Sequence, residues 1–311
     1  MSPADDVLVI GDANPDLVLT GDVVPTFGQA ETLVDSADLV LGGSAAITAC
    51  GLARLGVRVA LAATVGDDLF GTFVRDALGD RGVDTRWLRV DPEVRTAVSV
   101  VLSGGDRAIL TFPGAIAATG PEVIDEGLVA SVRHVHSASY FLLPRLAAHL
   151  PEVFARARAA GAGTSVDTNW DPSGAWSGID RLLERTDVLL PNTAELLALT
   201  GRTDRDEAAR VVLGHGCQVA LKDGADGGVL WQSPDLVTRV PAPPVDAVDT
   251  TGAGDSFDAG YISALVEGLT PHQCLVRAVT CGSLSTRAVG GTAGQPRLDE
   301  LPGGFRRASS T

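Results

Sequence analysis

The sequence predicts an α/β fold: a three-layer α/β/α core with a mostly parallel central sheet, carrying a small β-sheet lid. Short apolar runs alternate with helical patterns along most of the 311 residues. Such alternation is typical of parallel sheets covered by helices on both faces. Two extended stretches, 17–41 and 96–112, interrupt the alternation, and we assign the lid to them. We expect a single domain over residues 1–311.

The alternating elements follow one another along the chain. Gly56, Gly82 and Gly161 come just after three helical patterns, where a residue in the left-handed region commonly ends a helix. Each strand is expected to be followed by a turn and a helix. The expected helices cover 47–55, 67–78 and 151–160, and the expected strands cover 7–10, 59–65, 132–136, 165–167, 188–190 and 219–222.

The two lid segments are extended, half apolar and without helical periodicity. We interpret them as one small sheet that covers a cleft, and a pair of ordinary surface hairpins is the alternative. The turn residues that divide the segments into short strands are Gly21, Pro25, Gly28, Gly104 and Gly105.

The net charge of the chain limits the kinds of molecule that it is expected to bind. The net charge is −15 and the basic residues are scattered, whereas nucleic-acid binding depends on clustered lysine and arginine. We therefore expect no nucleic-acid partner. A polyanionic ligand would have to be held by local backbone dipoles and a metal ion, because the overall field is repulsive.

The N-terminus and the cysteines indicate a cytoplasmic protein. The chain begins MSPADD, with no basic region and no apolar run, so we expect neither a signal peptide nor a membrane partner. The cysteines at 50, 217, 274 and 281 form no C-x-x-C pair. We expect them to be free thiols in a reducing compartment.

The sequence V-D-T-T-G-A-G-D-S-F-D-A-G at 248–260 predicts an anion-binding turn. An apolar repeat at helical spacing begins at Phe257, which places Gly252, Ala253 and Gly254 at the N-terminus of a helix. The first amides of a helix have no intrahelical partner and carry the positive end of its dipole. Glycine also lets the backbone come close to a ligand.

Asp255 lies in the first turn of this helix. It is about 160° around the helix axis from Phe257, so we expect it to face the glycine turn. A carboxylate beside an anion hole suits phosphoryl transfer, because it can take the proton of an attacking hydroxyl while the amides meet the charge on the transferred group. The alternative is an ordinary capping aspartate.

Other nucleotide-binding and catalytic motifs match the sequence less well. No third glycine completes a dinucleotide fingerprint, since Phe257 stands there, and no G-x-x-x-x-G-K-[ST] loop exists because the one lysine, Lys222, follows Leu221. The G-D-S block ending at Ser256 resembles the nucleophile block of one esterase group. Only His272 follows it, without an aspartate three residues before, and G-x-S-x-G is absent. A serine hydrolase is kept as the competing hypothesis.

These motifs together resemble the ribokinase-like, PfkB-type carbohydrate kinases, over nearly the whole chain. D-T-T-G-A-G-D-S-F at 249–257 resembles that family's C-terminal signature, and G-G-S-A-A at 42–46 through A-R-L-G at 53–56 is similar to its N-terminal one. Further similar blocks are T-V-G-D-D-L-F-G at 64–71, D-T-N at 167–169, P-N-T-A-E at 191–195 and L-K-D-G-A-D-G-G at 221–228.

The resemblance implies a role for each matching residue. Asp255 would be the base, and Gly252, Ala253 and Gly254 would form the anion hole. The substrate hydroxyls would be bound by Asn14, Asp16, Gly42 and Gly43. Asn192 and Glu195 would lie near the phosphates and the Mg²⁺ water shell. The nucleotide site would be lined by Lys222, Gly224 and Gly227. A monovalent cation, K⁺ in part of the family, would bind at Asp249 and Thr251.

The residues alone agree with part of this and leave alternatives open. Asp16 follows the first strand, and ligands of open parallel sheets bind outside the carboxyl ends of the strands, but a solvated loop aspartate is the alternative. Asn192 and Glu195 could equally form a helix N-cap. Lys222 could be a surface lysine at a strand end.

Two departures concern the sugar. The family's N-terminal signature usually has an asparagine where this chain has Ile47, which cannot hydrogen-bond a hydroxyl. Some relatives also supply a glutamate from the region of 136–143, where this chain has none. These departures favour a substrate that is more apolar than ribose or differently substituted.

The resemblance thus implies an enzyme that uses ATP and Mg²⁺ to phosphorylate a hydroxyl of a small sugar-like molecule. Closure of the lid would exclude water from the transfer. The resemblance also implies a homodimer, because lid sheets in that family often pair between subunits, and an exposed lid edge would otherwise invite uncontrolled strand pairing. A nucleoside kinase of the same fold is one alternative, and a binding protein that has lost catalysis is another.

Overall fold

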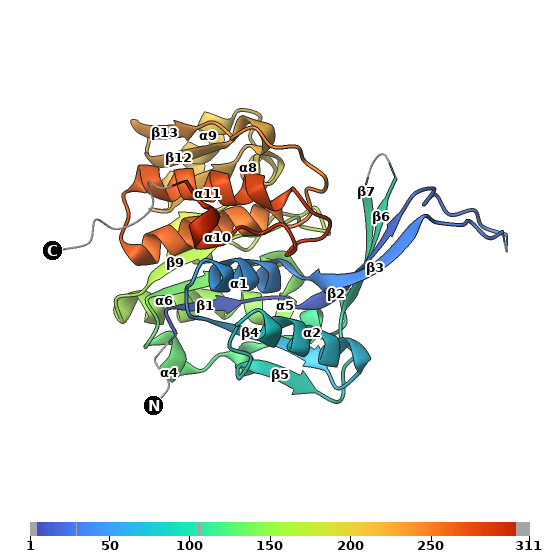
Figure 1. Cartoon of the computed structure of the whole chain (residues 1–311). Coiled ribbons are helices and arrows are strands. Elements are labelled where there is room, and N and C mark those ends of the chain that lie inside the picture. The colour runs from blue at the N-terminus through green and yellow to red at the C-terminus, as the bar shows by residue number, and fades with distance from the viewer. Residues whose placement is uncertain (1–4, 29, 105–106, 303–311) are drawn as a thin grey trace.

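A nine-stranded sheet forms the centre of the molecule (Figure 1). The structure is a computed structural model, and it describes residues 5–28, 30–104 and 107–302. The sheet order is β13-β12-β11-β10-β9-β8-β1-β4-β5, and the strands from β11 to β5 run parallel. The bounds are β1 Val7–Ile10, β4 Val59–Gly66, β5 Leu88–Asp91, β8 His134–Ser137, β9 Gly163–Val166, β10 Val188–Leu189, β11 Gln218–Lys222, β12 Gly228–Ser233 and β13 Leu236–Val240.

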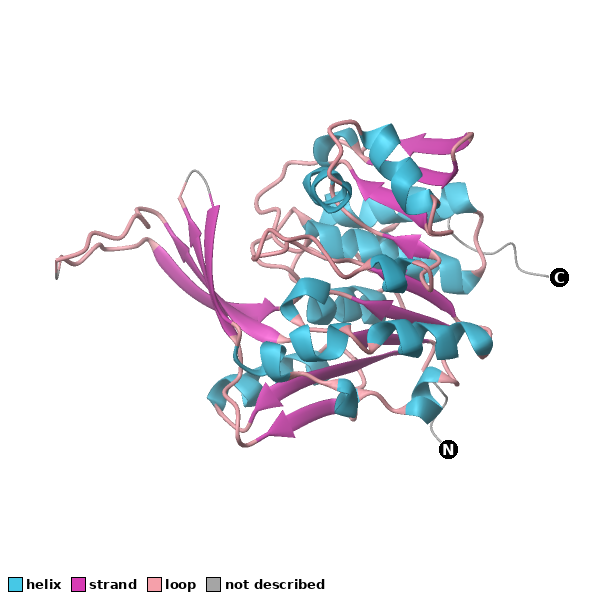
Figure 2. Ribbon diagram, turned by 180° about the vertical axis from the view of Figure 1, so that it is seen from behind, coloured by secondary structure: helices cyan, strands magenta, loops and turns pink. Residues whose placement is uncertain are grey.

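Helices cover both faces of this sheet, which confirms the three predicted layers (Figure 2). Successive strand residues point to opposite faces, so Val7 and Val9 pack with one set of helices while Leu8 and Ile10 pack with the other. The first set is α1 Ser44–Arg54, α2 Leu69–Asp80, α10 Ala253–Glu267 and α11 Pro271–Ser285. The second is α3 Gly114–Ala118, α4 Glu126–Val129, α5 Pro144–Ala147, α6 Leu150–Ala159, α7 Asp180–Leu183, α8 Thr193–Thr200 and α9 Arg205–Leu213.

A separate four-stranded sheet projects from the core (Figure 1) and confirms the predicted small sheet. Its order is β3-β2-β6-β7, with β2 paired in parallel to β6 and antiparallel to β3. Because β2 begins soon after β1 ends, this lid sheet starts at the carboxyl edge of the central sheet. The bounds are β2 Asn14–Thr20, β3 Ser36–Gly42, β6 Val98–Ser103 and β7 Arg107–Phe112.

One local expectation was wrong. The strand at 218–222 is followed by the antiparallel pair β12 and β13, where we expected a helix. The helix that carries Asp255 is buried on nearly all sides and has no exposed face opposite Phe257, because α1 and α11 both pack against it.

Three further points concern the cysteines, membrane-spanning helices and the C-terminal tail. All four cysteines are free and buried, as expected. No helix in the described ranges has the length and apolar character needed to span a membrane. The terminal sequence R-R-A-S-S-T at 306–311 predicts a frayed tail, and these positions lie outside the described residues.

Candidate active site

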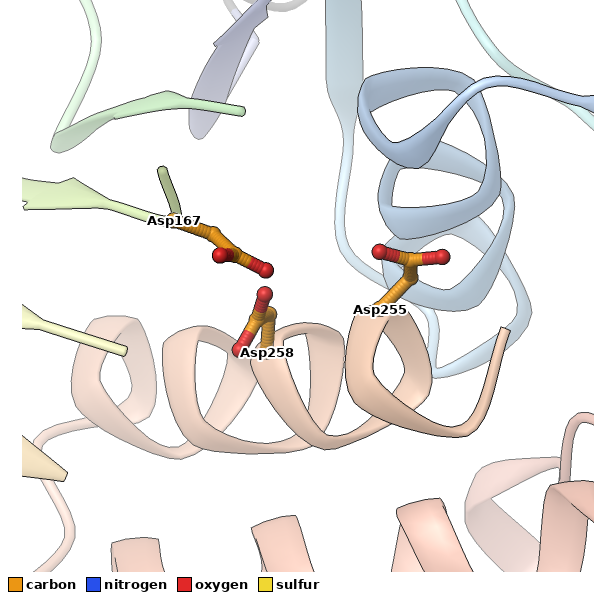
Figure 3. A group of neighbouring side chains, drawn as sticks. All are labelled: Asp167, Asp255 and Asp258. Atoms are coloured by element: carbon orange, nitrogen blue, oxygen red, sulfur yellow. The ribbon is translucent and has the colours of Figure 1, made fainter. Parts of the chain in front are cut away.

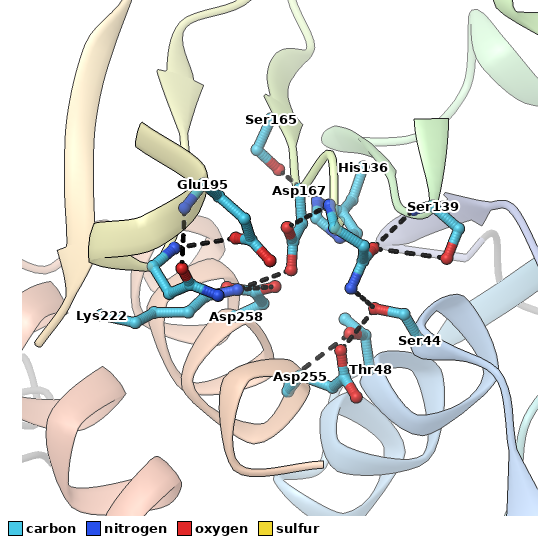
Figure 4. Close-up of polar contacts among 12 residues, drawn as sticks. Ser44, Thr48, His136, Ser139, Ser165, Asp167, Glu195, Lys222, Asp255 and Asp258 are labelled. Atoms are coloured by element: carbon cyan, nitrogen blue, oxygen red, sulfur yellow. Dashed lines mark hydrogen bonds and ion pairs between the residues drawn. The ribbon is translucent and has the colours of Figure 1, made fainter. Parts of the chain in front are cut away.

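Polar side chains at or just after the ends of β8, β9 and β11 lie close to the N-termini of α1 and α10, at the carboxyl edge of the sheet (Figure 4). Asp12 follows β1, and its carboxylate accepts hydrogen bonds from the amides of Ser44 at 3.1 Å and Ala45 at 2.9 Å. It thereby binds two of the free donors that begin α1. Gly43 precedes them with φ +87°, a left-handed conformation that favours glycine.

The predicted anion-binding turn precedes α10. Gly252 has φ +70°, and a Cβ at that position would lie 2.6 Å from the Cα of Gly291. The amide of Ala253 donates to the Thr250 carbonyl oxygen at 3.2 Å, so it is less available than we expected. The amides of Gly252, Gly254 and Asp255 have no carbonyl partner within the described ranges. These three amides are the donors that an anion would meet.

A second loop is connected to this turn through Asp249. The carboxylate of Asp249 accepts hydrogen bonds from the Thr251 amide at 2.9 Å, the Thr251 hydroxyl at 2.7 Å and the Gly290 amide at 2.8 Å. The predicted cation-binding pair thus lies together and connects the glycine turn to residues 290–291. Ile47 packs against the same loop, since a Cβ on Gly291 would be 2.5 Å from its Cδ1.

Asp255 is 9% exposed and faces α1. Its carboxylate accepts a hydrogen bond from the hydroxyl of Ser44. The Ser44 oxygen in turn accepts from Asn169 Nδ2 at 3.1 Å, and Asn169 Oδ1 accepts from the Ser139 amide at 2.8 Å. Burial raises the pKa of Asp255 to about 7, against the opposing effects of the Lys222 charge and the Ser44 hydrogen bond.

Backbone strain marks the same chain of contacts. Ser139 has φ +58° and Asn169 has φ +53°, which are uncommon values for residues other than glycine. Such conformations persist only where the surroundings fix them, and they cluster at functional sites. Here they direct the Ser139 amide, after β8, toward Asn169, and the Asn169 carboxamide, after β9, toward Ser44.

A buried ion cluster lies beside Asp255 on α10 (Figure 3). Lys222 Nζ is 2.6 Å from Asp167 Oδ2 and 2.9 Å from Asp258 Oδ2. Burial alone would raise the pKa of Asp167, but the Lys222 charge and hydrogen bond lower it overall. Asp258 is fully buried, and burial raises its pKa well above the usual range despite Lys222.

This cluster does not fit a divalent metal site. Asp167, Asp255 and Asp258 each offer an oxygen within 4.8 Å of the others, a spacing that could suit a cation. The ammonium of Lys222, however, already lies on two of these carboxylates. We therefore interpret the cluster as a set of ion pairs.

The predicted substrate residues also lie together. Asn14 and Asp16 are buried at the start of β2, and Asn14 Nδ2 donates to Asp16 Oδ1 at 2.9 Å. Gly42 pairs with Asn14 across β2 and β3, and a Cβ on Gly42 would be 2.1 Å from Asp16 Oδ1. Together with Gly43, these residues occupy the junction between the lid sheet and the core.

The predicted nucleotide residues lie around the ends of β10 and β11. Asn192 and Glu195 form a capping box at the start of α8, as the helix N-cap alternative predicted. Burial, followed by the charge of Asp167, raises the pKa of Glu195 to about 7. Gly224 has φ +57° and open space around it, whereas a Cβ on Gly227 would lie 2.1 Å from the Val240 carbonyl oxygen.

Several residues of this site received no role from the sequence. Ser44, Asp167 and Asn169 stand in matching blocks, but nothing in their spacing shows that they meet Asp255. Asp258 could have been identified from the sequence, because it comes three residues after Asp255 and residues three apart lie on one face of a helix. Asp12 lies two residues after the end of the first strand, at the edge where parallel sheets bind ligands.

The family model described as pfkB family carbohydrate kinase matches residues 4–298. An ATP-dependent ribose-1-phosphate kinase from Halopiger xanaduensis is 34% identical over 284 residues, which cover 90% of this chain and 91% of that protein.

Two solved structures share the fold. The ribokinase of Arabidopsis thaliana, complexed with ribose and ATP, superposes with a TM-score of 0.85 at 26% identity, covering 96% of this chain and 97% of that one. An E. coli protein described as a ribokinase II, in complex with ATP and Mg²⁺, gives a TM-score of 0.84 at 26% identity, covering 95% and 97%. The chain therefore belongs to the pfkB family of carbohydrate kinases.

Proposed function

We propose that this protein transfers the γ-phosphoryl group of ATP to a hydroxyl of a small sugar or sugar-like molecule. The observation that carries this proposal is the placement of Asp255, whose buried carboxylate belongs to the first turn of the helix that the glycine turn begins. The carboxylate can accept a proton, and the amides of the glycine turn can donate hydrogen bonds to the negatively charged group that is transferred.

The residues act in three ways. Asp255 accepts the proton of the attacking hydroxyl and is held in place by Ser44. The amides of Gly252 and Gly254 donate to the transferred group, and the helix dipole of α10 adds to their effect. Asn14, Asp16, Gly42 and Gly43 bind and orient the substrate hydroxyls where the lid sheet joins the core.

The nucleotide and metal requirements follow from the family. We propose that Gly224, Gly227 and the end of β11 line the ATP site, and that Asn192 and Glu195 contact the water shell of Mg²⁺. Bound Mg²⁺ would neutralise charge on the phosphates. A requirement for K⁺ at Asp249 and Thr251 stays a prediction, because the Asp249 carboxylate already accepts hydrogen bonds from the Thr251 amide of its own loop and the Gly290 amide of the second loop.

An aromatic cluster beside Asn169 bears on which class of substrate the protein accepts. Trp170 directly follows Asn169 and is 56% exposed. Its ring lies 5.0 Å from that of Trp176, which lies 5.3 Å from Phe141. This cluster favours a substrate with an apolar or planar part, so the nucleoside alternative is kept. Sugars, sugar phosphates and nucleosides assayed side by side will separate the two classes.

The hydrolase hypothesis lacks support in the structure. Ser256 is 1% exposed, and its hydroxyl accepts a hydrogen bond from Gln295 Nε2 at 3.2 Å. His272 is exposed in the first turn of α11. A serine-reactive phosphonate is expected to leave Ser256 unlabelled, and covalent labelling there would contradict the kinase proposal.

The rate should depend on the ionisation of Asp255. With its pKa raised to about 7 by burial, kcat/KM is expected to fall roughly tenfold per pH unit below pH 7. His134 and His136 cannot cause this limb, because burial lowers their pKa values to about 4 and about 3. Glu195 is the competing group, so the profile should be measured for wild type and Glu195→Gln. Loss of the limb in Glu195→Gln would reject Asp255 as its source.

We also propose a homodimer formed through the lid sheet. Its edge strands are β3 and β7, and edge strands invite pairing with another chain. Ile109 and Leu110 on β7 are 57% and 63% exposed. Light scattering is expected to give a dimer for wild type and a monomer for Ile109→Lys with Leu110→Lys. Val211→Lys, on α9, is the control and should remain dimeric. A monomeric wild type at micromolar concentration would contradict the proposal.

A further inference from the structure

Lys222 is the only lysine in the chain, and it is almost fully buried. It stands at the end of β11, where its ammonium binds Asp167 at the end of β9 and Asp258 on α10. Burial alone would lower the pKa of Lys222, but the charges of these two carboxylates raise it. The ammonium is therefore a fixed cation that joins three separate elements.

This cation lies directly beneath the glycine turn. An ideal Cβ on Gly254 would be 3.5 Å from Lys222 Nζ and 3.4 Å from its Cδ. Asp258 is also one helical turn beyond Asp255 on the same face of α10, and their carboxylate oxygens lie within 4.8 Å of one another. Lys222 is thus close both to the anion hole and to the base.

The charged groups that act on Asp255 stand after β1 and β9, at the end of β11 and on α10. Asp12 follows β1, Asp167 follows β9 and Asp258 shares α10, and all three are acidic. Ser44 on α1 contributes a neutral hydroxyl. Against these carboxylates, the cation that acts on Asp255 is Lys222. Without it, neighbouring negative charges and burial would both favour the protonated carboxyl, which cannot act as a base.

We propose that Lys222 is a positioning residue for Asp255: its ammonium, fixed between Asp167 and Asp258, keeps the base ionised and adds positive charge beneath the anion hole. This inference rests on the proposed kinase function. It assigns Lys222 a place within the catalytic charge balance, whereas the family resemblance implies only a contact with the nucleotide.

The kinetic test compares Lys222→Met with a charge-balanced double variant. In Lys222→Met, the acid limb of kcat/KM should move to higher pH by about one unit, which is roughly a tenfold loss below the limb. Adding Asp167→Asn removes the unpaired negative charge, so the limb should return toward wild type. Arg202→Met, an exposed position after α8, is the control for loss of one positive charge. An unmoved limb in Lys222→Met, or no recovery in the double variant, would overturn the proposal.

A second measurement does not depend on turnover. Protein grown with ¹³C-labelled lysine gives one lysine Cε signal, because the chain has one lysine. In Glu195→Gln, which lacks the other carboxylate with a pKa of about 7 that acts on Lys222, this signal should show an inflection near pH 7 as Asp255 titrates. The inflection should vanish when Asp255→Asn is added to that background. An inflection that persists unchanged after this addition would show that Lys222 and Asp255 are not coupled. If wild type phosphorylates no substrate, the kinase proposal fails while this coupling is still decided by the signal.

Discussion

Replacing Asp255 with asparagine is expected to lower kcat by about 10²–10⁴-fold, the range typical for loss of a general base. Asparagine keeps the shape of the side chain and can still meet the Ser44 hydroxyl, but it cannot accept the substrate proton. Because the glycine turn is untouched, ATP binding measured by calorimetry should remain. Steady-state turnover of wild type and variant on one accepted substrate measures the effect.

The stability of the same variant provides its control. Burial gives Asp255 a folded-state pKa of about 7, above its unfolded value of about 3.9. The native state therefore binds the proton more tightly, and the contribution of this group to stability falls as pH rises from about 4 to about 7. Asp255→Asn should consequently melt at the same or a higher temperature at pH 8. A variant that loses turnover only because its melting temperature falls would contradict the role as a base.

Replacing Gly252 with alanine is expected to reduce kcat by about 10²–10³-fold, the usual cost of losing an anion-hole donor. Gly252 is left-handed, and the new Cβ would meet the backbone of Gly291 at 2.6 Å. The turn must shift to relieve this contact, which displaces the amides from the transferred group.

A matched substitution separates the clash from backbone strain alone. Gly201 ends α8 with φ +63°, and nothing lies within 4 Å of its Cβ position. Gly201→Ala should therefore lower stability by about 1 kcal/mol while leaving kcat unchanged. Equal losses of activity in both variants would show that the Gly252 turn has no special role.

The sequence predicted the architecture well where local patterns are strong. Alternating strands and helices identified the parallel sheet, and turn residues in extended segments identified the lid sheet. The hairpin of β12 and β13 was missed because its first strand, Gly228–Ser233, is apolar and short enough to be compatible with a buried helix. The pattern around Phe257 predicted a helix correctly but not its burial, which depends on α1 and α11.

Only those site residues that belong to a local sequence pattern could be predicted. Asp255 and the glycines of its turn are defined by a few adjacent positions. The contacts among Ser44, Asn169 and Asp255 join segments more than a hundred residues apart, and no spacing in the sequence encodes them. Lys222 reads as an ordinary strand-end lysine until the fold brings Asp167 and Asp258 to it.

The most direct test of the account is the identification of the product. Wild type and Asp255→Asn should be incubated with MgATP and a panel of ketoses, aldoses, sugar phosphates, polyols and nucleosides, and followed by ³¹P NMR. We expect a new phosphate ester with matching release of ADP for at least one compound with wild type, and almost none with the variant. ADP release without a phosphate ester, or an ester formed equally by the variant, would contradict phosphoryl transfer to a hydroxyl with Asp255 as the base.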